Sequence, residues 1–251
     1  MTKKRIIGHR GARNIWPENG LTGFREVLKL GVDGVEFDLH PSADGELVVI
    51  HDPTLDRTTE ARGPVAARSV AELTGIRLKD GGGDRIPRFD EALDILVPAG
   101  VELHIELKVS ASGEPYPGLE RRALDAVRRR NLGRRAVLTS FSPAVLSELR
   151  RLAPGLRTLG SMNRDFAERQ GGVEALLRRF EELGVELIAV EKSLLAERLP
   201  FFLERVGAAR LVAWVVNEPA DIDRWLAAPI GTITTDRPDL ALAAMTGGPR
   251  A

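Results

Sequence analysis

The stretch Gly34–Asp52, GVEFDLHPSADGELVVIHD, predicts a strand, a tight turn and a returning strand. Apolar and acidic residues alternate through its first strand, Val35–Leu39. Because the side chains of a strand alternate between its two faces, Glu36 and Asp38 point the same way. Two carboxylates on one face of an otherwise apolar strand are costly to bury unless a cation or hydrogen-bond donors meet them.

The turn at Asp44-Gly45 predicts a hairpin, with Glu46–Ile50 as its returning strand. Asp38 lies about six residues before this turn and His51 about six after it, so a regular antiparallel return brings the imidazole to the height of the carboxylates. A single acid on a strand is usually a solvated surface residue. Two acids and a histidine that converge at one level indicate a functional site instead.

The rest of the chain alternates predicted strands and helices, which is typical of a parallel sheet with right-handed crossovers. Eight strands are predicted besides the hairpin return, at residues 5–11, 35–39, 101–108, 136–141, 156–161, 187–190, 211–216 and 231–235. Helices are predicted at residues 17–30, 89–96, 119–130, 173–183, 196–206 and 219–226, with another starting at Pro143. Residues 53–88 are the least regular segment and are predicted to be loop with one short helix near residues 69–73.

These eight units predict an α/β fold, a single (β/α)8 barrel with a β-hairpin extension after strand 2 and only a short insertion. No linker divides the chain, so we expect one domain over residues 1–251 with a core at about 5–240. A doubly wound open sheet is the alternative, but the first turn has no glycine-rich phosphate loop.

A barrel of this kind places its chemistry at the carboxyl ends of the strands. Polar residues end nearly all of the predicted strands: His9, Arg10, Glu36, Asp38, Glu106, Lys108, Glu191, Asn217 and Asp236, with Trp214 near the end of the seventh. His104 shares the strand face of Glu106 but lies deeper, so we expect a hydrogen-bonded core histidine.

The composition is that of a globular enzyme, with 43% hydrophobic and 29% charged residues. Lys plus Arg and Asp plus Glu both number 36, so no overall charge favours nucleic acid or stable association with an anionic membrane. Cysteine is absent, the N-terminus has no apolar signal region, and no apolar run is long enough to span a membrane. We expect a cytoplasmic protein; its oligomeric state is not visible in the sequence.

Several motifs match one family in order and spacing over almost the whole chain. They are His9-Arg10-Gly11, Pro17-Glu18-Asn19, Glu36-x-Asp38, His51-Asp52, Arg57-Thr58-Thr59, Glu106-x-Lys108, Trp214-x-x-Asn217 and Thr235-Asp236-Arg237-Pro238. Together they make the chain resemble the glycerophosphodiester phosphodiesterase family. The resemblance implies a (β/α)8 barrel, a divalent cation, and hydrolysis of small-molecule glycerophosphodiesters to glycerol 3-phosphate and an alcohol. The chain departs from the family pattern at Gly20 and Val216, where the family commonly has threonine.

Hydrolysis of a phosphodiester concentrates negative charge on the phosphoryl oxygens and on a poor alkoxide leaving group. Glu36, Asp38 and Glu106 are the predicted ligands of Mg²⁺ or Ca²⁺, because hard carboxylates suit these ions better than zinc. The alternative interpretation of Glu106 is a purely structural one, an ion pair with Lys108 on the same face of its strand.

The resemblance and the titration of imidazole near neutral pH make His9 and His51 the predicted acid–base pair, acting through a cyclic phosphodiester. Which histidine acts first stays open, and either is alternatively a metal ligand. Predicted phosphate contacts are Arg10 and Lys108. Predicted supporting residues are Glu18, Asn19, Trp214 and Asn217, and Glu191 is a possible pocket residue.

Two other functions compete with this one. A related barrel lyase, similar to a phospholipase D-like toxin or a phosphatidylinositol phospholipase, stops at the cyclic product. A non-catalytic barrel that binds phosphodiesters lacks one of the acid–base or metal positions, and none is missing here.

Overall fold

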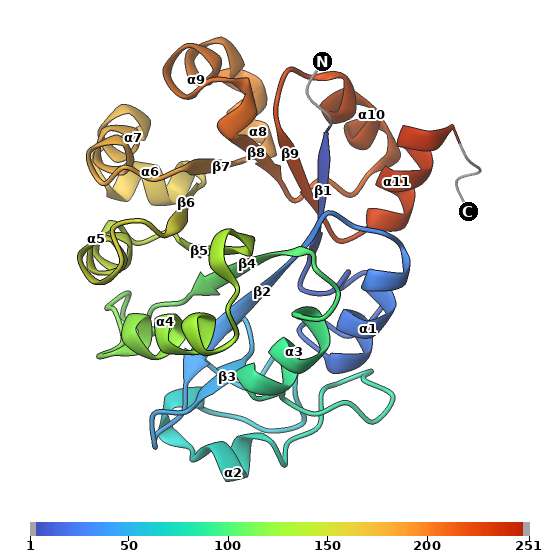
Figure 1. The fold of residues 1–251 in the computed structure, drawn as a ribbon, viewed down its shortest axis with the longest axis vertical. Coiled ribbons are helices and arrows are strands. Elements are labelled where there is room, and N and C mark those ends of the chain that lie inside the picture. The colour runs from blue at the N-terminus through green and yellow to red at the C-terminus, as the bar shows by residue number, and fades with distance from the viewer. Residues whose placement is uncertain (1–3, 248–251) are drawn as a thin grey trace.

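The computed structural model describes residues 4–247; the predicted domain also includes residues 1–3 and 248–251, which lie outside the described residues. Its sheet has the strand order β1-β9-β8-β7-β6-β5-β4-β2-β3, and β1 also pairs with β2. That last pairing closes eight parallel strands into a barrel, so the closed (β/α)8 architecture is confirmed over the open sheet. Figure 1 shows the helices arranged around the outside of the strands.

The barrel strands lie close to the predicted ranges. They are β1 (Arg5–His9), β2 (Gly34–Pro41), β4 (Glu102–Leu107), β5 (Ala136–Ser140), β6 (Arg157–Met162), β7 (Leu187–Glu191), β8 (Leu211–Trp214) and β9 (Thr232–Thr235). The ninth strand, β3 (Leu47–Val49), runs antiparallel to β2, with Leu39 opposite Val49. The predicted hairpin extension after strand 2 is therefore present.

The helices are α1 (Leu21–Lys29), α2 (Val70–Leu73), α3 (Phe89–Leu96), α4 (Leu119–Arg129), α5 (Pro143–Leu152), α6 (Arg164–Arg169), α7 (Val173–Glu182), α8 (Lys192–Glu197), α9 (Leu199–Val206), α10 (Pro219–Ala227) and α11 (Pro238–Thr246). Short 3₁₀ turns lie at Val65–Ala67, Gly133–Arg135 and Ala208–Arg210. The sequence missed α6, α8 and α11, and the helix predicted at 196–206 is α9, which begins at Leu199. The helix predicted from Pro17 begins only at Leu21, because Asn19 has a left-handed backbone with φ +58° that a right-handed helix excludes.

The alternation read from the sequence separates the two faces of β2. Phe37 points outward to the helix layer, where its ring lies 5.6 Å from that of Phe24 in α1 and 5.9 Å from that of Phe89 in α3. Glu36 and Asp38 occupy the opposite face and are buried inside the barrel. The outer contacts hold the strand in position for its inner carboxylates.

The interior of the barrel has an apolar side and a charged side. Strands β5 to β8 contribute a buried cluster of Val137, Leu159, Leu187, Ala189 and Val212. Strands β1, β2 and β4 contribute ionisable groups instead, among them those at the strand ends. The polar residues of the sequence motifs therefore gather on one side of the barrel.

The amino end of the barrel is closed by an ionic network around Glu102. This carboxylate lies 2.6 Å from Arg5 Nη2, accepts a hydrogen bond from His104 Nε2 at 2.7 Å and pairs with Arg157. His104 is thus a buried, hydrogen-bonded core histidine, as predicted.

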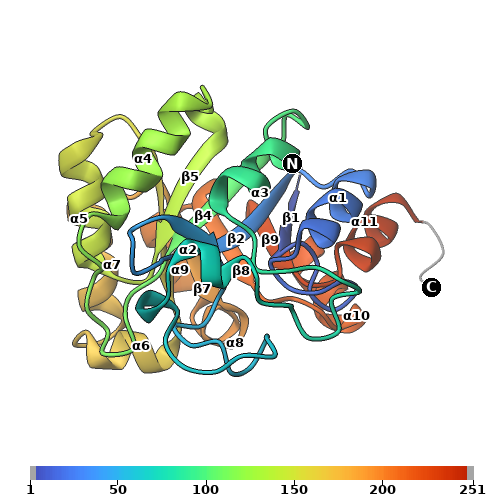
Figure 2. The same cartoon turned by 90° about the horizontal axis from the view of Figure 1, so that it is seen from below.

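The irregular segment at residues 53–88 contains α2 and lies beside β3 in Figure 1; Figure 2 shows it from below. Its apolar residues form a small separate core with Val48 and Ile50. The segment also caps α1, since Asp84 accepts hydrogen bonds from Thr22 N at 2.9 Å and Thr22 Oγ1 at 3.0 Å. A Cβ on Gly20 would lie 2.6 Å from Asp84 Oδ2, so a side chain at position 20 would have to displace this carboxylate from its present place.

Among the helices of residues 4–247, none is long and apolar enough to cross a membrane.

Gly160→Ala is expected to destabilise the fold, because the new Cβ would lie 2.7 Å from Cδ2 of the buried Phe180. Overpacking of this kind costs about 1–3 kcal/mol of unfolding free energy, measurable by urea denaturation. Gly155→Ala is the control, since nothing lies within 4 Å of its Cβ position. Equal stability of the two variants would contradict the proposed clash. Adding Phe180→Leu to the Gly160→Ala variant should restore part of the lost stability.

Candidate active site

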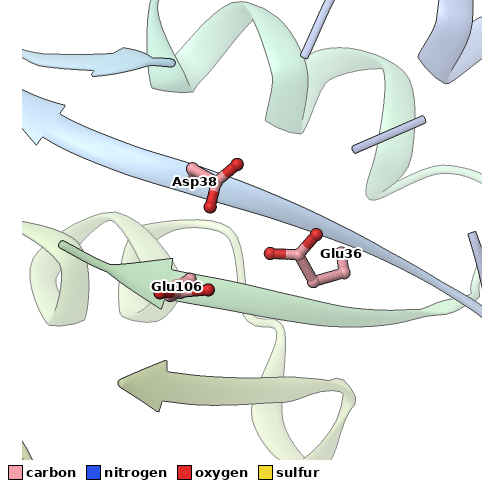
Figure 3. Close-up of side chains that lie close together, drawn as sticks. All are labelled: Glu36, Asp38 and Glu106. Atoms are coloured by element: carbon pink, nitrogen blue, oxygen red, sulfur yellow. The ribbon is translucent and has the colours of Figure 1, made fainter. Parts of the chain in front are cut away.

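Three carboxylates converge inside the barrel near the carboxyl ends of two adjacent strands. Asp38 of β2 is the register partner of Glu106 of β4, and Glu36 lies one inward position earlier on β2. One oxygen from each of the three residues lies within 4.8 Å of the others. Figure 3 shows Glu36 and Asp38 on β2 facing Glu106 on β4. The strand alternation thus brings the predicted ligand set together.

Two cations partly balance these acids. Lys108 Nζ lies 2.7 Å from Glu106 Oε1 and 2.9 Å from Asp38 Oδ1, while Arg10 Nε lies 3.3 Å from Asp38 Oδ2. The balance is incomplete, since Glu36 Oε1 is buried and accepts no hydrogen bond. Burial, followed by the charges of Asp38 and Glu106, raises the pKa of Glu36 well above its usual value. Burial opposes ionisation of Asp38 as well, but Lys108 and Arg10 hold its pKa well below the usual range.

His9 is oriented by a carboxylate from the last strand segment. Its Nδ1 lies 2.5 Å from Asp236 Oδ1, and its Nε2 lies 3.7 Å from Glu36 Oε2. The burial of Asp236 by itself raises the pKa of its carboxyl group. The hydrogen bond with His9 outweighs this effect and brings the pKa down to about 2. An ionised carboxylate only accepts, so the Nδ1 of His9 donates and its Nε2 is left for the cavity.

Asp236 is itself held by Asn217, whose Nδ2 donates to Asp236 Oδ2 at 2.7 Å and whose Oδ1 accepts from Asp236 N at 2.9 Å. Asn217 therefore acts on His9 through this carboxylate. Asp236 ends a predicted strand, but no role for it follows from the sequence pattern; the motif Thr235-Asp236-Arg237-Pro238 is the available signal.

His51 has a matching arrangement. Its Nδ1 lies 2.6 Å from Asp52 Oδ1, and Arg57 Nε donates to Asp52 Oδ2 at 2.6 Å. The hydrogen bond with His51, aided by Arg57, lowers the pKa of Asp52. Arg57 also binds Glu18 with two hydrogen bonds of 2.8 Å, which joins the irregular segment to the loop after β1. The roles of Asp52 and Arg57 were not predicted.

Glu18 and Asn19 support the cluster. Asn19 Nδ2 donates to Asp38 Oδ2 at 2.8 Å, and Glu18 Oε1 accepts from Arg10 Nη1 at 3.2 Å. Both Arg10 and Asn19 have positive φ, 51° and 58°, in a region that arginine adopts at a cost. The loop is therefore held in a strained form by its contacts with β2.

These groups surround a cavity of about 240 Å³. It is lined by His9, Arg10, Glu36, His51, Glu106 and Lys108, together with Trp214 and several residues of the apolar side. The Trp214 ring lies 5.6 Å from that of Phe141 and forms a wall, while its buried Nε1 has no hydrogen-bond partner. The two predicted acid–base residues and two of the predicted ligands, Glu36 and Glu106, thus line one cavity. Asp38 is fully buried and does not line it, although its carboxylate lies within 4.8 Å of the other two.

Glu191 is not part of this cavity. Its carboxylate accepts hydrogen bonds from Ser193 N and Leu194 N, both at 3.2 Å, and so caps α8. The position at a strand end was consistent with a pocket residue, but the short link to α8 turns the side chain toward the helix.

His40 is a buried residue whose role the sequence pattern does not indicate. Its Nε2 lies 3.1 Å from the carbonyl oxygen of His51, and its Nδ1 lies 3.1 Å from Tyr116 Oη. Burial lowers the pKa of His40 to about 4, so the ring is neutral at pH 7. Because a carbonyl oxygen only accepts, Nε2 carries the proton and Tyr116 donates to Nδ1. His40 therefore fixes the backbone of His51.

Residues 9–240 match the model of the glycerophosphoryl diester phosphodiesterase family. The chain belongs to this family. It is accordingly an enzyme of the glycerophosphodiester phosphodiesterase type, a phosphoric diester hydrolase. A glycerophosphodiester phosphodiesterase of Caldanaerobacter subterraneus subsp. tengcongensis is 30% identical over 243 residues, which cover 94% of this chain and 96% of the relative.

Solved structures of this family have the same fold. A putative glycerophosphoryl diester phosphodiesterase of Agrobacterium tumefaciens is 27% identical, with a TM-score of 0.89 over 97% of this chain and 98% of that one. A phosphodiesterase of Oleispira antarctica, solved in complex with the product sn-glycerol-3-phosphate, is 22% identical, with a TM-score of 0.83 over 96% of each chain.

His40→Leu is expected to lower the free energy of unfolding by about 1–3 kcal/mol, because it leaves the His51 carbonyl and the Tyr116 hydroxyl without their partner. His40→Gln retains an amide donor for the carbonyl and should lose less. Tyr116→Phe removes one hydrogen bond only and is the matched comparison. Urea denaturation of the three variants measures the order of their stabilities. A leucine variant as stable as the glutamine variant would contradict the predicted order.

Proposed function

We propose that the protein hydrolyses glycerophosphodiesters to glycerol 3-phosphate and an alcohol, using a divalent cation and two histidines. The observation that carries the proposal is the cluster of Glu36, Asp38 and Glu106 at a single cavity that Glu36 and Glu106 line together with His9 and His51. The product bound in the Oleispira antarctica structure supports glycerol 3-phosphate as the product here.

The residues of the acidic cluster fit a hard cation. They offer oxygen ligands only, the type that Mg²⁺ and Ca²⁺ prefer, and the buried Oε1 of Glu36 has no hydrogen-bond donor. Three carboxylates face only two cationic side chains, Arg10 and Lys108. The cluster therefore has room, in charge, for a further cation. When bound, Mg²⁺ or Ca²⁺ supplies Lewis-acid stabilisation of the charge that develops on the phosphoryl oxygens.

His9 is the proposed first base. It is buried and burial lowers its pKa, which leaves the ring neutral with an unprotonated Nε2 directed at the cavity. This nitrogen takes the proton of the neighbouring glycerol hydroxyl, whose oxygen attacks phosphorus.

His51 is the proposed acid, because it lines the inner cavity and also a larger cavity beside it, which His9 does not line. As the bond from phosphorus to the alcohol oxygen breaks, the protonated Nε2 of His51 gives its proton to that oxygen. Water then opens the cyclic phosphodiester with the two roles reversed. Asp236 and Asp52 keep both rings in the required orientation.

Arg10 and Lys108 are the proposed phosphate contacts. Both line the inner cavity, and Glu18 orients the Arg10 guanidinium. The planar fork of Arg10 suits two phosphoryl oxygens, while Lys108 acts as a point charge between the phosphate and the carboxylates.

Activity is expected to require the cation. Chelation should abolish turnover, and Glu36→Gln should weaken Mg²⁺ and Ca²⁺ binding in calorimetric titration while the unfolding transition is unchanged or raised, since a buried charge is removed. Glu191→Gln, which removes a carboxylate outside the cluster, is the matched control and should bind metal normally. Full turnover by metal-stripped enzyme in chelator would refute the requirement.

Replacing His9 or His51 by alanine should lower kcat/KM by about 10²–10⁴-fold on glycerophosphodiesters with an alkyl leaving group. A phosphodiester of glycerol and p-nitrophenol has p-nitrophenolate as its leaving group, which needs little protonation. It should therefore rescue His51→Ala much more than His9→Ala. Equal losses for both variants on both substrates would reject the division of roles.

The product distinguishes this reaction from that of a lyase. Phosphorus NMR of a glycerophosphodiester incubated with Mg²⁺ or Ca²⁺ should give glycerol 3-phosphate as the final species, with any cyclic phosphodiester consumed.

A further inference from the structure

A larger cavity of about 720 Å³ adjoins the inner one. The two share His51, Glu106, Lys108, Phe141 and Asn163 along their border. His9, Arg10 and Glu36 line only the inner cavity. A substrate that reacts between the two histidines therefore has its glycerol phosphate part in the inner space and its alcohol part in the outer one.

The outer cavity has a cationic wall that the chemistry proposed above does not use. Arg169 of α6 and Arg179 of α7 line the outer cavity but not the inner one. Within residues 4–247 neither guanidinium has a carboxylate within 4.0 Å, whereas Arg164, Arg198 and Arg205 of the neighbouring segments all pair with a glutamate.

The positions of these two arginines are set by neutral groups. Arg179 Nη1 donates to Gln170 Oε1 at 2.9 Å, and Arg169 Cζ lies 5.7 Å from the centre of the Phe166 ring. Such contacts orient a guanidinium without neutralising it, so both charges remain available to a ligand. The facing loop carries one acid on this cavity, Glu114, which is exposed and pairs with no cationic side chain of the described chain.

We infer that the outer cavity is a subsite for the alcohol part of the substrate and selects alcohols that carry an anionic group. Arg169 and Arg179 bind that group, and Phe141 and Phe166 form the adjoining apolar wall. An alcohol that has an ammonium group as well as a carboxylate, such as serine, also finds a partner in Glu114. This inference rests on the proposed function, because it names the substrate class of the same site.

Two substrates isolate the anionic group. Glycerophosphoserine and glycerophosphoethanolamine differ only by one carboxylate on the alcohol, and both keep the same phosphodiester and the same ammonium group. The expected result is a kcat/KM about three- to tenfold higher for glycerophosphoserine at low salt, and a smaller ratio at high salt, as befits partly exposed ion pairs.

The variants Arg169→Gln and Arg179→Gln, alone and combined, should lower kcat/KM for glycerophosphoserine and leave that for glycerophosphoethanolamine within about twofold. Arg178→Gln is the matched control, since it removes the same charge from the same helix at a position that does not line the cavity. It should leave the substrate ratio unchanged. The unfolding transition of each variant reports whether the fold is retained.

The outcomes separate the two claims. Turnover of both substrates with no preference, or a preference that the double variant retains, would overturn the subsite while the proposed function stands. An equal change in Arg178→Gln would assign the preference to the general field of the protein and also overturn the subsite. No turnover of either substrate with Mg²⁺ or Ca²⁺ would overturn the proposed function together with the inference.

Discussion

The burial of Glu36 and Asp38 on the inner face of β2, beside the half-buried Glu106 of β4, is the constraint on which the active site depends. An ionised group without a partner in a protein interior costs several kcal/mol. Here Arg10, Lys108 and Asn19 offset part of that cost for Asp38, and Glu36 retains an oxygen with no donor. The site is therefore stable only as a unit, and its cations and amide are as necessary as the acids.

The barrel accommodates this cost by confining it to one side. Apolar side chains of β5 to β8 fill the other side of the interior, and Trp214 borders both. On the outer face of the same β2 strand, Phe37 packs between α1 and α3. The strand that carries the costliest residues is thus also among the most firmly packed, which keeps the carboxylates in place when their charges repel.

Much of this arrangement could be predicted from local patterns. The alternation in Val35–Leu39 placed Glu36 and Asp38 on one face, and the Asp44-Gly45 turn placed His51 beside them, because both inferences need only the period of a strand. Glu106 followed from the same period once the barrel was assumed.

Partners brought together by tertiary folding were beyond those patterns. The role of Asp236 depends on a contact with His9 across 227 positions, and that of Asp84 on a contact with Thr22 across 62. His40 looked like an ordinary strand residue, because its two hydrogen-bond partners come from a backbone carbonyl and from a tyrosine 76 positions away. For Glu191 the interaction that matters is local instead of distant. Its side chain caps α8 through hydrogen bonds with Ser193 and Leu194, and so does not point into the cavity.

The pairing of His9 with Asp236 also bears on how the chain is synthesised. Every predicted metal ligand and both histidines are made within the first 106 residues, yet β9 must pair with β1 before the barrel closes and Asp236 meets His9. A nascent chain, or one terminated early, carries the predicted ligands and both histidines without the carboxylate that orients His9. On the proposed mechanism, hydrolytic competence arrives with the final strand, late in translation, so an incomplete polypeptide has little capacity to hydrolyse a phosphodiester.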